Sequence, residues 1–143
     1  MAEQREIAGS HDDGGKLVLR LALGLLVLFH GVSKLLGGPA LAFVLGVSAK
    51  AGLPSAFGYL VFIGEVVAPL LLILGLWTRV GGLILVINMI VAVALVHSGQ
   101  LFGINSSGGY ELELQAMYLF SAVAVALLGA GRYSLGGIDG RWN

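Results

Sequence analysis

The chain has little charge for its length. Of its 143 residues, 57% are hydrophobic and only 11% are charged, with equal numbers of acidic and basic residues. An ordinary soluble domain carries about 25% charged residues, so this chain lacks the polar surface that would cover a soluble fold. The zero formal net charge and the absence of a basic tract argue against nucleic acid as a partner. The composition therefore predicts a membrane protein whose first partner is the lipid bilayer.

Cysteine is absent from the sequence. This excludes thiol–disulfide chemistry within the chain, an iron–sulfur cluster held by its own thiolates, and a c-type haem attached through cysteine. The sequence also carries no signature for a flavin or another haem. Any electrons that the protein handles are therefore expected to come from a partner protein or a bound substrate.

Four long apolar runs dominate the rest of the chain: 17–36, 57–76, 80–96 and about 112–130. Each approaches the ~20 residues that an α-helix needs to cross ~30 Å of hydrocarbon. We therefore predict an all-α fold, a bundle of four transmembrane helices in one domain over residues 17–135. The polar segment 1–16 is expected to be a disordered cytoplasmic tail, and 136–143 a short C-terminal tail.

The connector between the first two runs predicts a short helix. Pro39 is suited to the first helical turn, and Gly52 and Pro54 are suited to ending the helix. We expect it to lie at the membrane interface between the first and second spans. Close packing is expected between the last two spans, because Ala122, Ala126 and Ala130 form a stripe of small residues and the pair 81–82 is glycine.

The distribution of basic residues predicts the orientation, because short cytoplasmic loops are enriched in lysine and arginine. An N-terminus inside the cell places six basic residues inside and two outside. The inner set is Arg5, Lys16, Arg20, Arg79, Arg132 and Arg141, and the outer set is Lys34 and Lys50. We therefore expect both termini to be cytoplasmic.

Glu65 lies near the middle of the second apolar run, and Pro69 follows four residues later. An ionised acid at the bilayer centre is unfavourable by about 3 kcal/mol on insertion scales, so it is expected to face the bundle interior. Proline has no N–H, which leaves the Glu65 carbonyl without its helical donor. The pattern therefore predicts two acceptors at one depth, suited to a proton, a cation or a hydrogen-bonding ligand.

His30 lies at a depth similar to that of Glu65, and Lys34 lies four residues later on the same helix face, nearer the surface. His30 lies ~9 Å before the end of the first run and Glu65 ~12 Å into the second, at 1.5 Å per residue. Glu65 and His30 are the predicted catalytic pair, a proton relay. The predicted ligand-binding residues are His30, Lys34, Glu65, Asn88, His97 and Glu111.

A structural interpretation stands beside this one. The His–Glu–Lys cluster and Asn88 could serve only to join helices, and Lys34 could extend to the headgroups. His97 and Glu111 could be solvated residues at loop edges. His30, His97 and Glu111 have metal-ligating chemistry, but their spacing does not require an ion, so no metal site is predicted.

Several motifs together resemble the DoxX family. They are the HG-x-x-K pattern of residues 30–34, the glutamate at 65, the GL-x-TR turn at 75–79, the GGYELEL opening of the last run and the later GAGRYSLGG. The likeness runs from about residue 17 to residue 135. The chain departs from the family ending GPGR-x-SLD at Ala130 and Gly136, and Asp139 comes three residues later.

The resemblance implies a small four-helix protein of a bacterial-type inner membrane. It implies a link to quinone-coupled oxidoreductases, including small subunits of thiosulfate:quinone oxidoreductase, and to complexes that handle sulfur compounds and oxidative stress. The positions that it carries over are His30, Lys34, Glu65 and Arg79, and also Glu111.

Three functions remain open from the sequence. The first is a redox membrane subunit with protein partners, in which the His/Lys/Glu cluster binds a quinone-type ligand or a proton. The second is a non-enzymatic membrane scaffold that docks soluble redox or detoxification enzymes. The third is a conduit for protons or small solutes, which would need a homo-oligomer because four helices leave little room for a pore.

Overall fold

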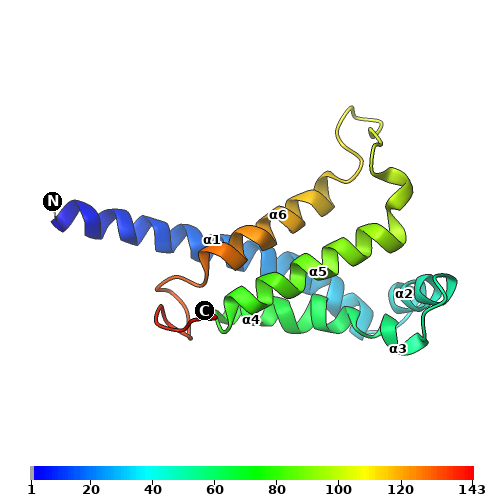
Figure 1. The fold of residues 1–143 in the computed structure, drawn as a ribbon, viewed down its shortest axis with the longest axis horizontal. Helices are drawn as coiled ribbons and strands as arrows, with labels where there is room; N and C mark the ends of the chain where they lie inside the picture. The colour runs from blue at the N-terminus through cyan, green and yellow to red at the C-terminus, as the bar shows by residue number, and fades with distance from the viewer. Residues whose placement is uncertain (1) are drawn as a thin grey trace.

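The computed structural model describes residues 2–143, which form helices joined by turns and loops (Figure 1). These residues contain no β-strand, and one isolated antiparallel bridge joins Ile104 to Tyr110. The elements are α1 (Ala2–Leu35), α2 (Pro39–Lys50), α3 (Ser55–Gly58), the π-helical turn η1 (Ile63–Val67), α4 (Ala68–Leu74), α5 (Thr78–Val96), the 3-10 turn η2 (Ser98–Gln100) and α6 (Glu113–Leu128). The predicted all-α class is confirmed.

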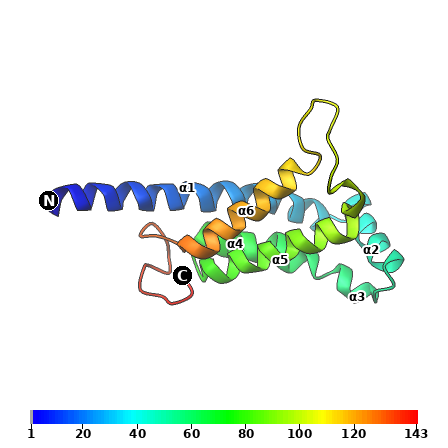
Figure 2. The ribbon, with the colours of Figure 1, turned by 45° about the horizontal axis from the view of Figure 1, so that its top comes forward.

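Helix α1 is longer than the first apolar run. Its 34 residues span ~51 Å at 1.5 Å per residue, and its N-terminal part projects beyond the bundle (Figures 1 and 2). Residue 1 lies outside the described part. Residues 2–16 continue the helix where the sequence predicts a disordered tail, because a formed helix gains a hydrogen bond with each added residue. Asp13 also holds this segment, accepting from the backbone N–H of Arg132 at 3.1 Å.

The second apolar run differs from the continuous helix that its length predicts. It divides into α3, η1 and α4, and Pro69 stands in the first turn of α4. The missing N–H of proline is tolerated at that position, since the first N–H groups of a helix have no intrahelical partner. The π-helical turn before it takes up the interruption, and Glu65 lies within that turn.

Three segments of residues 2–143 are long and apolar enough to cross a membrane: 11–35, 55–74 and Thr78–Val96. Helix α6 is also apolar, but its 16 residues fall short of the ~20 that span the hydrocarbon. The short helix between the first two spans is present as α2, with Pro39 in its first turn and Gly52 in a left-handed conformation after its end. Its position at a membrane interface remains a prediction.

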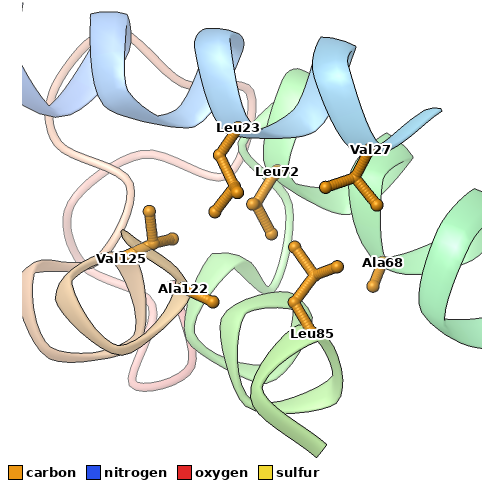
Figure 3. Packing of buried hydrophobic residues seen from close by; sticks show 7 residues of the cluster. All are labelled: Leu23, Val27, Ala68, Leu72, Leu85, Ala122 and Val125. Carbon is orange, nitrogen blue, oxygen red and sulfur yellow. The ribbon is translucent and has the colours of Figure 1, made fainter. Parts of the chain in front are cut away.

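The core lies where α1, α4, α5 and α6 meet (Figure 3). Its buried members are Leu23, Val27, Ala68, Leu72, Leu85, Ala122 and Val125. Gly82 lets α5 approach α6, because a Cβ at this position would lie 3.0 Å from the carbonyl oxygen of Ala122 and 2.9 Å from the amide nitrogen of Ala126. The predicted close packing of these small residues is confirmed.

Residues 129–143 cover the end of the bundle near both chain ends (Figure 1). The Asn143 side chain accepts from the Thr78 hydroxyl at 3.2 Å, and the Arg79 backbone N–H donates to the Trp142 carbonyl at 3.1 Å. Helices α2 and α3 lie at the opposite end (Figures 1 and 2). These two parts are called the terminus end and the cavity end below.

Candidate functional site

A cavity of about 750 Å³ opens at the cavity end, between α1, α2, α3, η1 and α5. Its lining is mostly aliphatic and aromatic. The polar and ionisable residues of the lining are His30, Lys34, Ser48, Glu65, Asn88 and His97. Five of the six residues predicted to bind a ligand therefore share one cavity.

Lys34 and Glu65 form an ion pair on the cavity wall. The Nζ of Lys34 lies 2.5 Å from Oε2 of Glu65, and each side chain is 12% exposed. Lys34 also approaches the His30 carbonyl oxygen at 3.5 Å, within its own helix. The Lys34 side chain therefore reaches the glutamate. Its positive charge offsets the unfavourable free energy of an unpaired carboxylate among apolar helices.

Two glycines bring the helices together around Glu65. A Cβ on Gly31 of α1 would overlap the Glu65 carbonyl oxygen, so only glycine permits this approach of α1 to η1. A Cβ on Gly64 would overlap the Asn88 side chain in the same way. The Glu65 carbonyl that Pro69 was predicted to release thus faces α1 at Gly31.

Asn88 of α5 brings an unpaired hydrogen-bond donor to this wall. Its Nδ2 atom is buried and has no hydrogen-bond partner within residues 2–143. A buried amide donor without a partner is destabilising by about 1–3 kcal/mol, and such groups are few in native structures. Within residues 2–143, Nε of Arg20 is likewise buried without a partner, but of these two residues Asn88 is the one that also lines a cavity.

The side chain of His30 is exposed, whereas a proton relay with Glu65 predicts a position inside the bundle. Its ring meets the edge of Tyr118 of α6 with 6.3 Å between ring centroids. Within residues 2–143, no hydrogen bond or ion pair joins His30 to Glu65, whose direct partner is Lys34. Both His30 and Glu65 nevertheless line the same two cavities.

The second cavity is smaller, about 110 Å³, and lies between α1, η1, α5 and α6. His30, Glu65, Gln115 and Tyr118 supply its polar groups. Gln115 Nε2 also lies 3.4 Å from Nε2 of His97, a residue of the large cavity. The two cavities are therefore neighbours that share part of their walls.

Glu111 is the one predicted ligand residue outside both cavities. It is exposed in the loop before α6, where its backbone N–H donates to the Gly103 carbonyl at 3.0 Å. The part of the chain that the structure describes holds no group of three or more His, Asp or Glu side chains arranged for a metal ion.

Ser48, Gln115 and Tyr118 are site residues that the sequence interpretation did not select. Gln115 and Tyr118 are three residues apart on α6, a spacing that puts them on one helix face. An amide inside the last apolar run is the signal that could have identified this face. No comparable sequence signal identifies Ser48 as a residue of the large cavity, because the contact between α2 and the rest of the bundle depends on tertiary packing.

The apolar helices and the polar groups between them define a helical membrane protein. The DoxX family model matches residues 15–98, more than half of the chain. The chain thus belongs to the DoxX family, as its motifs predicted. The match contains Lys34, Glu65 and Asn88, and it ends just after His97.

The chain is similar to a protein of Bacillus subtilis (strain 168) that bears the name "Putative oxidoreductase CatD". The two are 30% identical over 105 residues, which cover 73% of this chain and 76% of the relative. No solved structure matches the chain.

Proposed function

We propose that this DoxX protein is a membrane subunit of a quinone-linked oxidoreductase, in a complex that handles sulfur compounds or oxidative stress. The large cavity would bind a quinone-type ligand. Family membership and the name of the Bacillus relative support the redox class. The ligand class rests on the chemistry of the cavity wall.

The observation that carries this proposal is the buried, unpaired amide of Asn88 on the wall of an apolar cavity. A quinone presents carbonyl oxygens that need donors and an apolar ring or tail that suits an apolar lining. Asn88 supplies one donor and Lys34 a second. The volume of about 750 Å³ lies within the range of ~300–1,000 Å³ that small-molecule sites occupy.

The chain's own residues would bind the ligand and hold protons, while the quinone supplies the capacity to accept electrons. Glu65 can hold a proton at Oε2, and Lys34 balances its charge when the proton leaves. His30 lies beside the same cavity as a second proton-carrying group. The electrons would come from a partner protein or a bound substrate.

The test uses purified protein in lipid nanodiscs. Extraction and native mass measurement should recover an isoprenoid quinone from the wild type, and decylubiquinone should bind to quinone-depleted protein. Asn88→Leu removes the unpaired donor at similar volume, so its affinity should fall about tenfold, the value of one good hydrogen bond. Lys34→Met and Glu65→Gln should also weaken binding.

Matched controls exist on the same chain. Lys50→Met and Glu113→Gln make the same chemical changes at exposed residues that line neither cavity, so both should bind like the wild type. Equal affinity of Asn88→Leu and the wild type would contradict the proposed site. Co-purification of a soluble redox enzyme without any quinone would favour the scaffold function instead.

The membrane arrangement is part of the proposal: α1, the segment 55–74, α5 and α6 would be four spans, with α2 at the interface and both termini cytoplasmic. Single cysteines at Ser106 and Asp139, both exposed, should then react with an impermeant thiol reagent from opposite sides of an inner membrane. Labelling from the same side would refute the arrangement. Native mass measurement in the same nanodiscs would also report whether the protein is a homo-oligomer.

A further inference from the structure

The smaller cavity differs in character from the large one. It joins apolar side chains to four polar ones, those of His30, Glu65, Gln115 and Tyr118, within about 110 Å³. A quinone ring with its substituents is too large for that volume. Several water molecules would fit, because each takes about 30 Å³ in the liquid, and the polar side chains supply the two to four partners that a buried water needs.

Glu65 and His30 form the shared wall, because they line both cavities. The other lining residues are different. Gln115, Tyr118 and Met89 belong only to the small cavity, while Asn88 and Leu95 belong only to the large one. Glu65 thus borders two cavities, a large one with a mostly apolar lining and a small one in which four of the seven lining residues are polar.

We propose that the small cavity holds water and exchanges protons with Glu65, while the large cavity takes the quinone-type ligand. The ligand half of this inference rests on the proposed function, and the water half does not. In the exchange step, a hydrated proton moves from cavity water to a carboxylate oxygen of Glu65. One O–H bond breaks in the donor, one forms on the glutamate, and no electron is transferred.

The charged and titratable surroundings of Glu65 suit this role. Lys34 and His30 face the shared region from α1 and Tyr118 from α6, while α5 contributes the neutral residues Asn88 and Met89. Gln115 connects the small cavity to His97 at the end of α5 through the 3.4 Å contact. Because His97 also lines the large cavity, this contact joins polar groups on the walls of the two cavities.

Two matched substitutions separate the two cavities. Leu114 lines only the small cavity and Leu95 only the large one, and both are partly exposed on apolar helices. Leu114→Trp should therefore fill the small cavity, and Leu95→Trp should narrow the large one. Circular dichroism and thermal unfolding in nanodiscs check that both variants fold.

The first readout is hydroxyl-radical footprinting by X-ray pulses, in which water beside a methionine oxidises its sulfur. Met89 is buried against the small cavity, so its oxidation reports water there. Trp142 is exposed in the C-terminal segment outside the proposed spans and lines neither cavity, so its oxidation serves as the reference. Leu114→Trp should lower the oxidation of Met89 relative to Trp142 about tenfold by displacing that water, and Leu95→Trp should leave it unchanged.

The second readout is the rate at which the protonated Glu65 carboxyl exchanges with D₂O. It is measured at acidic pH by the infrared C=O band that is lost in Glu65→Gln. Leu114→Trp should slow the exchange about tenfold with unchanged decylubiquinone affinity. Leu95→Trp should show the reverse, weaker binding with normal exchange.

The inference would be overturned if Leu114→Trp left the oxidation of Met89 unchanged. It would also be overturned if the Glu65 carboxyl exchanged with D₂O more slowly in Leu95→Trp than in Leu114→Trp. If decylubiquinone fails to bind the wild type, the proposed function fails. The footprinting and exchange measurements would still decide whether the small cavity holds water that exchanges protons with Glu65.

Discussion

The two ends of the bundle hold their buried and half-buried cations in different ways. At the terminus end, Arg20 donates to the carbonyl oxygens of Leu72 at 2.6 Å and Tyr133 at 2.5 Å. Arg79 donates to Ala126 at 3.0 Å and to the neighbouring carbonyl of residue 127 at 2.6 Å. At the cavity end, the cation of Lys34 instead pairs with a side chain, Glu65, beside a large cavity.

This difference shows that burial of a charge does not by itself mark a functional site. The last carbonyls of a helix lack a regular intrahelical donor. Arg79 donates to such carbonyls at the end of α6, and Arg20 adds a second donor to the Leu72 carbonyl of α4, which also accepts from the Gly75 N–H. Their role is accounted for by structure. Within residues 2–143, Nε of Arg20 and Nδ2 of Asn88 are both buried without a hydrogen-bond partner. The two ends therefore differ in open volume, because Asn88 lines the large cavity and Arg20 lines neither cavity.

The largest effect on stability is expected from the terminus end. Arg20→Met removes the donor to two carbonyls within the packed bundle, so the free energy of unfolding should fall by about 3 kcal/mol. Reversible unfolding in detergent, followed by circular dichroism, measures the loss. Lys50→Met should change stability by no more than about 0.5 kcal/mol, because Lys50 is exposed.

Decylubiquinone affinity of the folded fraction should stay normal in Arg20→Met, since this residue lines neither cavity. Weaker decylubiquinone binding by fully folded Arg20→Met would contradict the assignment of ligand binding to the cavity end alone.

Gly31→Ala should have the next largest effect, and at the cavity end. The added methyl group would overlap the Glu65 carbonyl and come within 2.8 Å of the Val66 side chain, so α1 must move away from η1. Overpacking of this kind lowers stability by about 1–3 kcal/mol, and the Lys34–Glu65 pair should separate with it. Unfolding and decylubiquinone binding are the two measurements.

Gly46→Ala is the matched control for Gly31→Ala. Gly46 lies inside α2, and a Cβ there would meet no atom within 4 Å. Alanine favours a helix interior over glycine by roughly 1 kcal/mol, so this variant should be unchanged or slightly more stable. Equal losses in the two variants would mean that the close approach at Gly31 is unimportant.

The sequence predicted those features that depend on local patterns. Apolar length identified the long helices, and the isolated polar residues of these runs identified most of the polar groups on the large-cavity wall. Both signals are local, because a polar group in hydrocarbon is costly wherever the chain runs.

Features that depend on tertiary packing were not predicted. The partner of Glu65 is Lys34, although depth alone placed His30 nearer to the glutamate. Side-chain reach decides the partner, since lysine extends along the helix while the His30 ring turns toward Tyr118. The interruption of the second run was foreseen only as a lost donor at Pro69, because the sequence does not show that a π-helical turn absorbs it.

Pro69→Ala should have a smaller effect than Gly31→Ala. Restoring an N–H at residue 69 favours regular α-helical bonding across η1, which would rotate Glu65 relative to Lys34. The fold should survive, and decylubiquinone affinity should fall about threefold, which is less than 1 kcal/mol. Unchanged affinity would indicate that the π-helical turn is independent of the proline.

The sharpest comparison within the cavity end concerns which residue is coupled to Glu65. Double-mutant cycles with Glu65→Gln measure this coupling, once with Lys34→Met and once with His30→Gln. The ion pair at 2.5 Å predicts a coupling of about 1–2 kcal/mol in unfolding free energy for Lys34. His30 makes no direct bond to the glutamate within residues 2–143, so its coupling should stay below about 0.5 kcal/mol. The two residues still share both cavities, so His30→Gln should alter the deuterium exchange of Glu65 even where it leaves stability unchanged. A stability coupling for His30 as large as that for Lys34 would mean that the proton is shared directly between histidine and glutamate.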